Sequence, residues 1–397
     1  MPSPADVGIL GAGIAGCALA YHLADRGVGP VVVIDPKTPG AGATGRAAGI
    51  VTEQLWNRWD VEVTRESKTQ YAALSARWDP SAYTVNGFVR WARGDEAIRV
   101  LSSAVARLRS WGVTVDEIDA DALAARVPWG KFDDAPRAVW SPDDAVVTPS
   151  TMGEIYAEGA RQKGVEFRLG APIDRVRFED GAWAVECAGV ATRVRRLVVA
   201  AGAWSKRLLA SIGHPLPLAP YRTQAAVLRP ASGPAVFPSV HDIDVDVYAR
   251  PESNGRILAG DGTQLVEVDP ETFRTGADDS FVSNLAETFA IRLPGWADAE
   301  LVRAWAGICT STPDRRPFVG PIPGSDGVYV ITGFNGFGVM RAGGVAARLA
   351  DLLATGDGSD RAMERLGPAL PARLPDHPPP FAPRPGFTLD DGDDPRF

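Results

Sequence analysis

Three glycines and an aspartate near the start of the chain have the types and spacing that bind a phosphorylated dinucleotide. Gly11, Gly13 and Gly16 follow an apolar run at residues 7–10, and Asp35 ends the next apolar run, 24 positions after Gly11. Gly11 permits a tight turn, Gly13 lets a pyrophosphate approach a helix N-terminus, and Gly16 lets the helix pack closely on the strand. Asp35 is placed to accept hydrogen bonds from ribose hydroxyls, and its charge would repel a 2′-phosphate. The stretch predicts an adenine dinucleotide, with further contacts at Ile14, Ala15 and Pro36.

The elements that must position these residues are a strand, a helix and a second strand. The apolar runs 7–10 and 31–34 are the expected strands, and the Ala/Leu-rich segment ending at Gly27 is the helix. A second apolar strand at 197–200 runs into small residues and another helix, where we place Ala201, Gly202 and Trp204 beside the cofactor. The nucleotide domain is therefore expected to be discontinuous in sequence.

Residues 216–265 alternate as strands do and predict an antiparallel sheet that roofs the cofactor. Asn86-Gly87 within 83–92 is a strong hairpin signal. We expect an α/β fold, α+β overall, with a discontinuous Rossmann-like domain (1–82, 146–215 and 306–355) and a mainly antiparallel domain (83–145 and 216–305). Residues 356–397, rich in Pro and Asp, show no periodic pattern and are expected to form a tail.

The bulk composition excludes several classes of protein. The net charge of −8 and the pI near 5.2 argue against nucleic acid or an anionic membrane surface as partner. The chain has three scattered cysteines, Cys17, Cys187 and Cys309, which predict neither a disulfide framework nor a metal site. No apolar run approaches the roughly 18 to 20 residues of a membrane helix, and the first strand starts too early for a signal peptide. A cytoplasmic protein is expected.

Four motifs in order give the chain a family resemblance. They are the Gly11/Gly13/Gly16 turn, the loop GATGRAAGIV, the junction VVAAGAW and the run WAGICTSTPDRRPFVG…GVYVITGFNGFGVM. Across residues 5 to 355 the chain resembles the FAD-dependent D-amino-acid oxidase family, and within it the sarcosine oxidase, dimethylglycine dehydrogenase and glycine oxidase branch. The resemblance implies a two-domain flavoprotein with the substrate over one flavin face. The implied chemistry is oxidation of a C–N bond by hydride transfer to flavin N5, followed by hydrolysis of the imine.

The resemblance also implies where the FAD lies. Val176 corresponds to the position whose backbone meets the adenine, and the first loop contributes Thr44, Arg46, Ala47 and Ala48. The second glycine-rich turn precedes a helix, whose N–H groups and dipole would face the flavin C2 carbonyl. Its contacts would be Gly333, Asn335, Gly336, Phe337, Gly338, Val339 and Met340, with Gly307 nearby. Alternatives stay open: residues 36–50 as a flexible loop, Arg46 as a solvated side chain and Met340 as core filler.

Departures from the family pattern concern the flavin linkage and the substrate. Relatives with covalent flavin carry a His where this chain has Arg46, or a Cys at the position of Gly307, so non-covalent FAD is expected. Cys309 stands where D-amino-acid and glycine oxidases have a carboxylate-binding arginine, and Met340 stands where sarcosine oxidase has a lysine. Both of the cationic side chains that bind the substrate carboxylate in these relatives are therefore missing.

Replacement cations would have to come from the roof strands. Arg250 and Arg222, expected on neighbouring strands of the roof with Tyr248 and Tyr221, are the candidates, and solvent-exposed edge arginines are the alternative. The predicted catalytic residues are therefore Tyr248, Arg250, Arg222, Cys309 and Met340. No lysine occurs between Gly255 and Phe281, so the oxygen-activating lysine of sarcosine oxidase is expected to be absent, which favours a dehydrogenase or a slow oxidase.

The leading hypothesis is an oxidoreductase for a secondary or N-methylated amine or amino acid, with O2 or an electron-transfer partner as acceptor. The alternative is the flavin-bearing subunit of a multi-subunit amine or proline-type dehydrogenase that passes electrons to a partner. A nicotinamide-linked dehydrogenase would not need the second glycine-rich turn. A flavin-dependent aromatic hydroxylase would need a Gly-Asp motif later in the chain than residues 260–261. A binding module without catalytic activity is the least favoured interpretation of these motifs.

Overall fold

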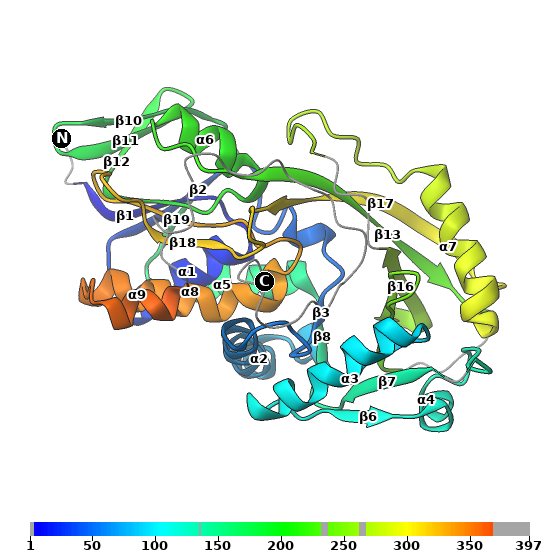
Figure 1. Ribbon diagram of the computed structural model, residues 1–397. Coiled ribbons are helices and arrows are strands. Elements are labelled where there is room, and N and C mark those ends of the chain that lie inside the picture. The colour runs from blue at the N-terminus through cyan, green and yellow to red at the C-terminus, as the bar shows by residue number, and fades with distance from the viewer. Residues whose placement is uncertain (1–3, 135, 232–236, 262–266, 368–397) are drawn as a thin grey trace.

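Two eight-stranded sheets form the framework of the computed structural model, which describes residues 4–134, 136–231, 237–261 and 267–367 (Figure 1). The first sheet has the order β10-β11-β12-β1-β2-β9, and β19 and β18 continue from β12. Its strands are β1 (Ala5–Leu10), β2 (Val31–Asp35), β9 (Glu166–Leu169), β10 (Ile173–Glu179), β11 (Ala182–Cys187), β12 (Val190–Val199), β18 (Phe318–Pro321) and β19 (Val328–Thr332). The pairs β1–β12, β1–β2, β2–β9 and β12–β19 are parallel, as a dinucleotide fold requires.

Alternation along the strands divides the apolar residues between the two faces of this sheet. Val7 and Ile9 pack into one core cluster, whereas Leu10 packs into another on the opposite face. The first cluster lies under four helices, α1 (Ile14–Asp25), α2 (Arg58–Trp78), α5 (Pro149–Gln162) and α8 (Gly338–Thr355). In Figure 1, α1, α5 and α8 cover one face, and the short α6 (Ser205–Ser211) lies on the other. Both faces are buried, which explains the uninterrupted apolar runs.

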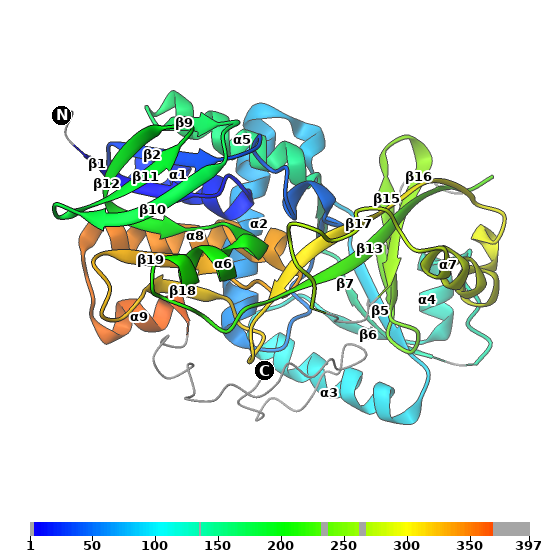
Figure 2. The same cartoon turned by 90° about the horizontal axis from the view of Figure 1, so that it is seen from above.

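The second sheet is almost entirely antiparallel, with the order β17-β13-β16-β15-β14-β5-β7-β6. Its strands are β5 (Phe88–Ala92), β6 (Asp116–Ile118), β7 (Arg137–Ser141), β13 (Ala219–Arg229), β14 (Ser239–Asp242), β15 (Val247–Glu252), β16 (Arg256–Asp261) and β17 (Glu300–Ser311). Helices α3 (Asp95–Ser110), α4 (Ala120–Arg126) and α7 (Asp279–Arg292) accompany it. A three-stranded sheet, β3 (Ile50–Val51), β8 (Ala145–Val147) and β4 (Tyr83–Val85), completes the fold. The long strands β13 and β17 run side by side from the first half of the molecule into the second (Figure 2).

The expected hairpin at residues 83–92 is wrong. β4 pairs with β8, whereas β5 pairs with β14 and β7, so Asn86-Gly87 connects two different sheets. Long-range contacts hold this connection: the Asn86 side chain donates to the Phe237 carbonyl at 3.0 Å, and a Cβ on Gly87 would lie 2.0 Å from the Trp140 ring. Tertiary pairing has overridden a local turn preference.

The segment expected to form a tail without a periodic pattern contains a helix. α9 (Asp360–Leu366) starts after Ser359, whose hydroxyl accepts a hydrogen bond from the Ala362 N–H, and it buries Leu366. The rest of that segment, 368–397, lies outside the described residues. The expected boundary at residue 306 falls inside β17, which belongs to the second sheet along its whole length. Among the described residues no helix is both long and apolar enough to cross a membrane.

The buried His22 should make the stability of the fold depend on pH. Its Nε2 lies 2.8 Å from Gln70 Oε1, and burial lowers the pKa of the imidazole from 6.5 to about 4. The unfolded chain takes up a proton on His22 near pH 6.5, whereas the folded chain does not. The neutral, buried His22 therefore contributes fully to the unfolding free energy above pH 6.5, and this contribution is lost as the pH falls toward 4. The shift corresponds to about 3 kcal/mol of unfolding free energy.

Urea unfolding of the protein between pH 7.5 and 4.5 measures this effect. His22→Gln should flatten the acid-side loss of stability, whereas His214→Gln, at a half-buried site away from Gln70, should leave it unchanged. An equally steep loss in His22→Gln would show that other groups cause it.

Candidate active site

One continuous cavity of about 980 Å³ runs between the two sheets. At one end it is lined by Asp35 and Val176, and at the other by Cys309, Tyr248 and Arg90. Its walls come from the turns after β1, β2, β12 and β19 and from the inner face of the second sheet. The shape suits a long ligand whose two ends contact different halves of the fold.

The first glycine-rich turn forms the dinucleotide end. Gly11 has φ +116°, and its N–H donates to the Ile34 carbonyl, so the turn is fixed across β1 and β2. A Cβ on Gly13 would have only the Thr44 hydroxyl nearby, at 3.6 Å, so the backbone here faces open cavity. Gly16 lies beneath the turn and does not line the cavity; its role is close packing, since a Cβ there would lie 1.9 Å from the Gly11 carbonyl oxygen.

Asp35 is held by backbone donors while it faces the cavity. Its Oδ2 accepts from the Ala12 N–H at 2.7 Å, and its Oδ1 accepts from the Lys37 N–H at 2.7 Å. Burial raises the pKa of Asp35, and these two hydrogen bonds oppose that shift. Each carboxylate oxygen has a second lone pair, which leaves acceptor capacity for ribose hydroxyls.

The loop at residues 36–50 is braced by its own arginine. Arg46 lines the cavity, and its Nη1 donates to the carbonyls of Ala41 at 2.6 Å and Gly42 at 2.9 Å. The Arg46 carbonyl in turn accepts from Trp305 Nε1 at 3.1 Å, which ties the loop to β17. The Thr44 hydroxyl accepts from the Ile14 N–H at 3.0 Å, in the first turn of α1. These bonds give a polar, preorganised wall where phosphates would lie.

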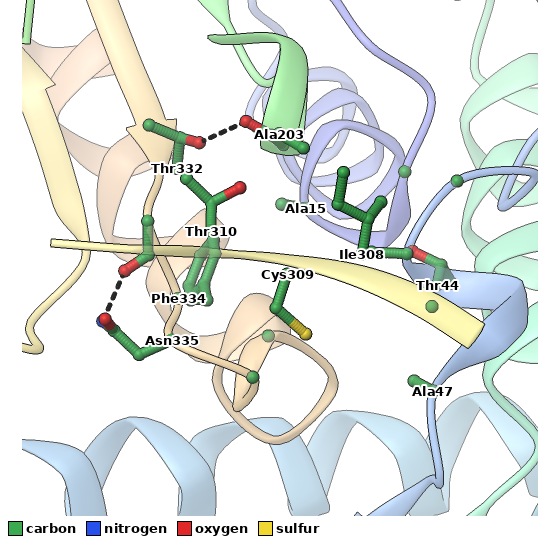
Figure 3. A pocket seen from close by; sticks show the side chains of 18 of the residues that line it. Ala15, Thr44, Ala47, Ala203, Ile308, Cys309, Thr310, Thr332, Phe334 and Asn335 are labelled. Carbon is green, nitrogen blue, oxygen red and sulfur yellow. Dashed lines mark hydrogen bonds between the residues drawn. The ribbon is translucent and has the colours of Figure 1, made fainter. Parts of the chain in front are cut away.

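Asn335 fastens the second glycine-rich turn to β17. Its Oδ1 accepts from the Ser311 hydroxyl at 2.6 Å and from the Thr312 N–H at 3.0 Å, and its Nδ2 donates to the Gly333 carbonyl at 2.7 Å. Figure 3 shows Asn335 beside Thr310 and Phe334 at this turn. The fixed turn leads into α8, whose first residues line the cavity, so the positive end of the helix dipole faces it.

Cys309 and Tyr221 face each other across β17 and β13 at the other end of the cavity. The Cys309 sulfur points into the cavity in Figure 3. The two side chains interact electrostatically, and burial raises the pKa of Cys309 to about 11, so the thiol stays neutral. Burial also raises the pKa of Tyr248, further along the same wall. Cys309 and Tyr248 are therefore both uncharged at neutral pH.

Most residues named from the sequence line this one cavity. They are Gly11, Gly13, Ile14, Ala15, Asp35, Pro36, Thr44, Arg46, Ala47, Ala48, Val176, Ala201, Gly202, Trp204, Gly307, Gly333, Asn335, Gly336, Phe337, Gly338, Val339 and Met340, together with Cys309 and Tyr248. Met340 also packs into two core clusters, so lining and core filling are combined at this position.

The two candidate arginines do not line the cavity. Arg222 is turned to the other face of β13, where it pairs with Asp278 at 2.5 Å and donates to two backbone carbonyls. Arg250 is buried, pairs with Glu252 at 2.8 Å and donates to the Ala48 carbonyl, so it braces the first loop. Their strands are also not neighbours, because β16 lies between them.

Sequence reasoning missed a second group of lining residues. These include Trp56, Phe88, Arg90, His241, Asp246, Asp261, Arg315 and Arg316. Arg90 and Phe88 were assigned to the mistaken hairpin, which hid their place in the roof. The one available signal was His241, one of only four histidines in the chain.

Comparison with known proteins gives a consistent result. The family model described as FAD dependent oxidoreductase matches residues 6–352. Dimethylglycine dehydrogenase of Rattus norvegicus is 27% identical over 90% of this chain, which spans 44% of that relative's length. Glycine oxidase of Pseudomonas aeruginosa is 29% identical, covering 87% of this chain and 93% of the relative. Among solved structures, L-proline dehydrogenase from P. horikoshii superimposes with a TM-score of 0.84 at 23% identity, covering 91% of this chain and 96% of the other.

Proposed function

Since the chain belongs to the FAD-dependent oxidoreductase family, we propose that it oxidises the C–N bond of an amine or amino acid, with a secondary or N-methylated amine as donor. The observation that carries this proposal is the single cavity that joins the glycine-rich turn to the roof of the second sheet. A dinucleotide bound at Asp35 would extend along it to the residues around Cys309 and Tyr248. The names of the relatives, a dimethylglycine dehydrogenase and a glycine oxidase, support a nitrogen-bearing substrate.

The lining residues fit FAD. The open backbone at Gly13 and the N-terminus of α1 suit a pyrophosphate, Asp35 suits a ribose, and the α8 N-terminus suits the electron-rich end of a flavin. Bound FAD supplies a hydride acceptor at N5. We propose that it is held without a covalent bond, since Arg46 and Gly307 offer no nucleophile and the Cys309 thiol is neutral.

The chain's own residues at this end of the cavity would orient the donor. Cys309, Tyr221 and Tyr248 are all neutral because burial raises their pKa values, so none is a general base at neutral pH. The amine reacts in its neutral form, because the nitrogen lone pair must form the C=N bond as the hydride leaves the carbon. Loss of a hydride from carbon to bound FAD and of a proton from nitrogen to water leaves a C=N bond, and a second water molecule then splits it into a carbonyl compound and an amine. Proximity and fixed electrostatics provide the catalysis.

Anaerobic mixing of the purified yellow protein with a panel of amines tests this function. The panel contains glycine, its N-methyl derivatives, D- and L-amino acids including proline, and carboxylate-free secondary amines. We expect loss of the visible flavin absorbance with at least one N-alkylated member, and acid precipitation should leave all of the FAD in solution. A colourless protein, or a flavin that no amine reduces, would contradict the proposal.

The same sample identifies the electron acceptor. Among lysines of the described residues only Lys37 lines the cavity, at the dinucleotide end, so no lysine is available there to stabilise reduced oxygen beside the flavin ring. We expect the reduced protein to be reoxidised faster by an artificial dye than by air. Fast reoxidation by air would make it an oxidase.

A further inference from the structure

A row of side chains crosses the second sheet on its cavity face. Arg90 on β5 lies opposite His241 on β14, and His241 lies opposite Tyr248 on β15. Residues directly opposite on neighbouring strands project from the same face, and all three line the cavity. The next position in the row is Gly260, where a Cβ would lie 2.2 Å from the Tyr248 hydroxyl. Arg90 and Tyr248 thus belong to one wall.

Hydrogen bonds connect this row to a carboxylate. Arg90 Nε donates to His241 Nδ1 at 3.2 Å, and His241 Nε2 lies 2.9 Å from Asp246 Oδ1. Because Nδ1 accepts, the ring proton is on Nε2, which donates to Asp246. The imidazole is therefore neutral, in agreement with the lowering of the His241 pKa by burial. A neutral spacer separates the Arg90 cation from the Asp246 anion.

Arg90 carries a full charge in an enclosed place. Its residue is only 2% exposed, its Nη1 donates to the Gln54 carbonyl at 3.1 Å, and its guanidinium lies 5.3 Å from the centre of the Phe88 ring. Burial lowers its pKa to about 10, which still leaves it protonated at neutral pH. A buried cation gains most from an anionic partner, and the planar guanidinium matches the geometry of a carboxylate.

We propose that Arg90 binds the carboxylate of the substrate, so that the oxidised amine is an amino acid. This rests on the proposed function and replaces Arg222 and Arg250, whose charges are paired outside the cavity. Arg315 and Arg316 also line the cavity, but they are half-buried in the turn beside Asp314. Asp246 and Asp261 act electrostatically on Tyr248, and Asp144 and Asp246 act on Arg90, so Arg90 is the side chain of this row that offsets the acidic groups and could attract an anion.

This position also orients the rest of the substrate. The row runs across the sheet from β5 through β14 and β15 toward β13 and β17, which carry Tyr221 and Cys309, so it leads from Arg90 toward the expected reaction centre. A carboxylate at Arg90 would place the nitrogen-bearing carbon along this row. Two aromatic rings also line the cavity: those of Trp56 and Phe337, whose centres are 4.9 Å apart and whose planes are at 82°. N-alkyl groups would contact these rings.

Titration of the FAD-loaded protein with acetate tests the anchor without turnover. Bound acetate should change the visible flavin spectrum in a saturable way, whereas acetamide should not. Arg90→Gln should weaken acetate binding by about 30-fold or more, the effect of a lost charged hydrogen bond. Arg137→Gln, on the neighbouring strand β7 with an exposed side chain, should bind acetate as the wild type does. Arg90→Lys keeps the positive charge but loses the two parallel donors of the guanidinium, so its acetate binding should be weakened by an intermediate amount. This variant is the test if Arg90→Gln does not fold.

Three outcomes would overturn the proposal. The first is acetate binding as tight as in the wild type by both Arg90→Gln and Arg90→Lys, and the second is no effect of acetate on the wild-type spectrum. The third is a loss of acetate binding only in a variant Arg316→Gln. If acetate binds through Arg90 but no amine reduces the flavin, the proposed function fails and the anchor stands. If carboxylate-free amines reduce the flavin as well as amino acids do, the anchor fails and the proposed function stands.

Discussion

Replacing Gly16 with alanine should prevent stable folding. A Cβ at this position would lie 1.9 Å from the Gly11 carbonyl oxygen and 3.4 Å from Ile9, and both the turn and β1 are buried. The clash is with backbone, so no side-chain rotation relieves it. We expect a loss of more than about 3 kcal/mol of unfolding free energy, at the upper end for overpacking. Urea unfolding and the yield of soluble protein measure it.

Gly13→Ala should have the opposite pattern. Its backbone has φ −69° and ψ 174°, which alanine adopts without strain, and only the Thr44 hydroxyl lies near the added Cβ. The methyl group would instead stand in the cavity where a pyrophosphate approaches the backbone. We expect unfolding of the FAD-free protein to change by less than about 0.5 kcal/mol, and FAD affinity to fall by about 100-fold or more.

The contrast between these two glycines separates structure from cofactor binding. Gly358→Ala is the control, because this exposed glycine has open space around it and should alter neither quantity. FAD binding is measured by titrating the apoprotein and following flavin fluorescence. Undiminished FAD affinity in Gly13→Ala would contradict the location of the pyrophosphate, and a stable Gly16→Ala would contradict the tight packing of α1 on the turn.

The dinucleotide half of the site was predictable because its signals are local. Gly11, Gly13 and Asp35 lie within one strand–helix–strand unit, and spacing alone specifies how they meet. The turn at Gly333 to Met340 was equally readable, since a strand, glycines and a helix follow one another in the chain. The family resemblance then specified FAD among dinucleotides, and the matching family model supports it.

The substrate end was not predictable because its residues meet only through long-range pairing. Arg90 and His241 are 151 positions apart and become neighbours through the parallel pair β5–β14. Alternation along β13 and β15 correctly predicted antiparallel strands, but it does not say which face of a strand lines the cavity, and Arg222 lies on the opposite face. The alternating pattern of a strand separates its residues into two faces, but only tertiary packing determines which face lines the cavity.

A buried ion pair beneath the second glycine-rich turn gives the last large effect. Arg341 on α8 is completely buried, and its Nε lies 3.1 Å from Asp60 Oδ1 on α2. Among the described residues, none accepts a hydrogen bond from its guanidinium nitrogens. Its charge is balanced by Asp60 and by the rings of Trp56 and Phe337, with centroids at 5.8 Å and 5.0 Å. Removing Asp60 would leave this cation uncompensated.

Asp60→Asn should therefore cost about 3 to 5 kcal/mol of unfolding free energy, the range for one lost partner of a buried pair. Arg341→Met should also destabilise, and the double variant should lose much less than the sum, because no unpaired charge remains. The exposed pair Arg58–Glu62 on the same helix is the control, where Arg58→Ala should change stability by about 0.5 kcal/mol or less.

The same variants connect stability to the site, because Trp56, Phe337 and Asp60 line the cavity. Asp60→Asn should shift the visible spectrum of bound FAD, whereas Arg58→Ala should not. Urea unfolding of the four proteins and their flavin spectra provide the measurements. If the losses of the two single variants simply add in the double variant, Asp60 and Arg341 act independently, which would contradict the proposed ion pair.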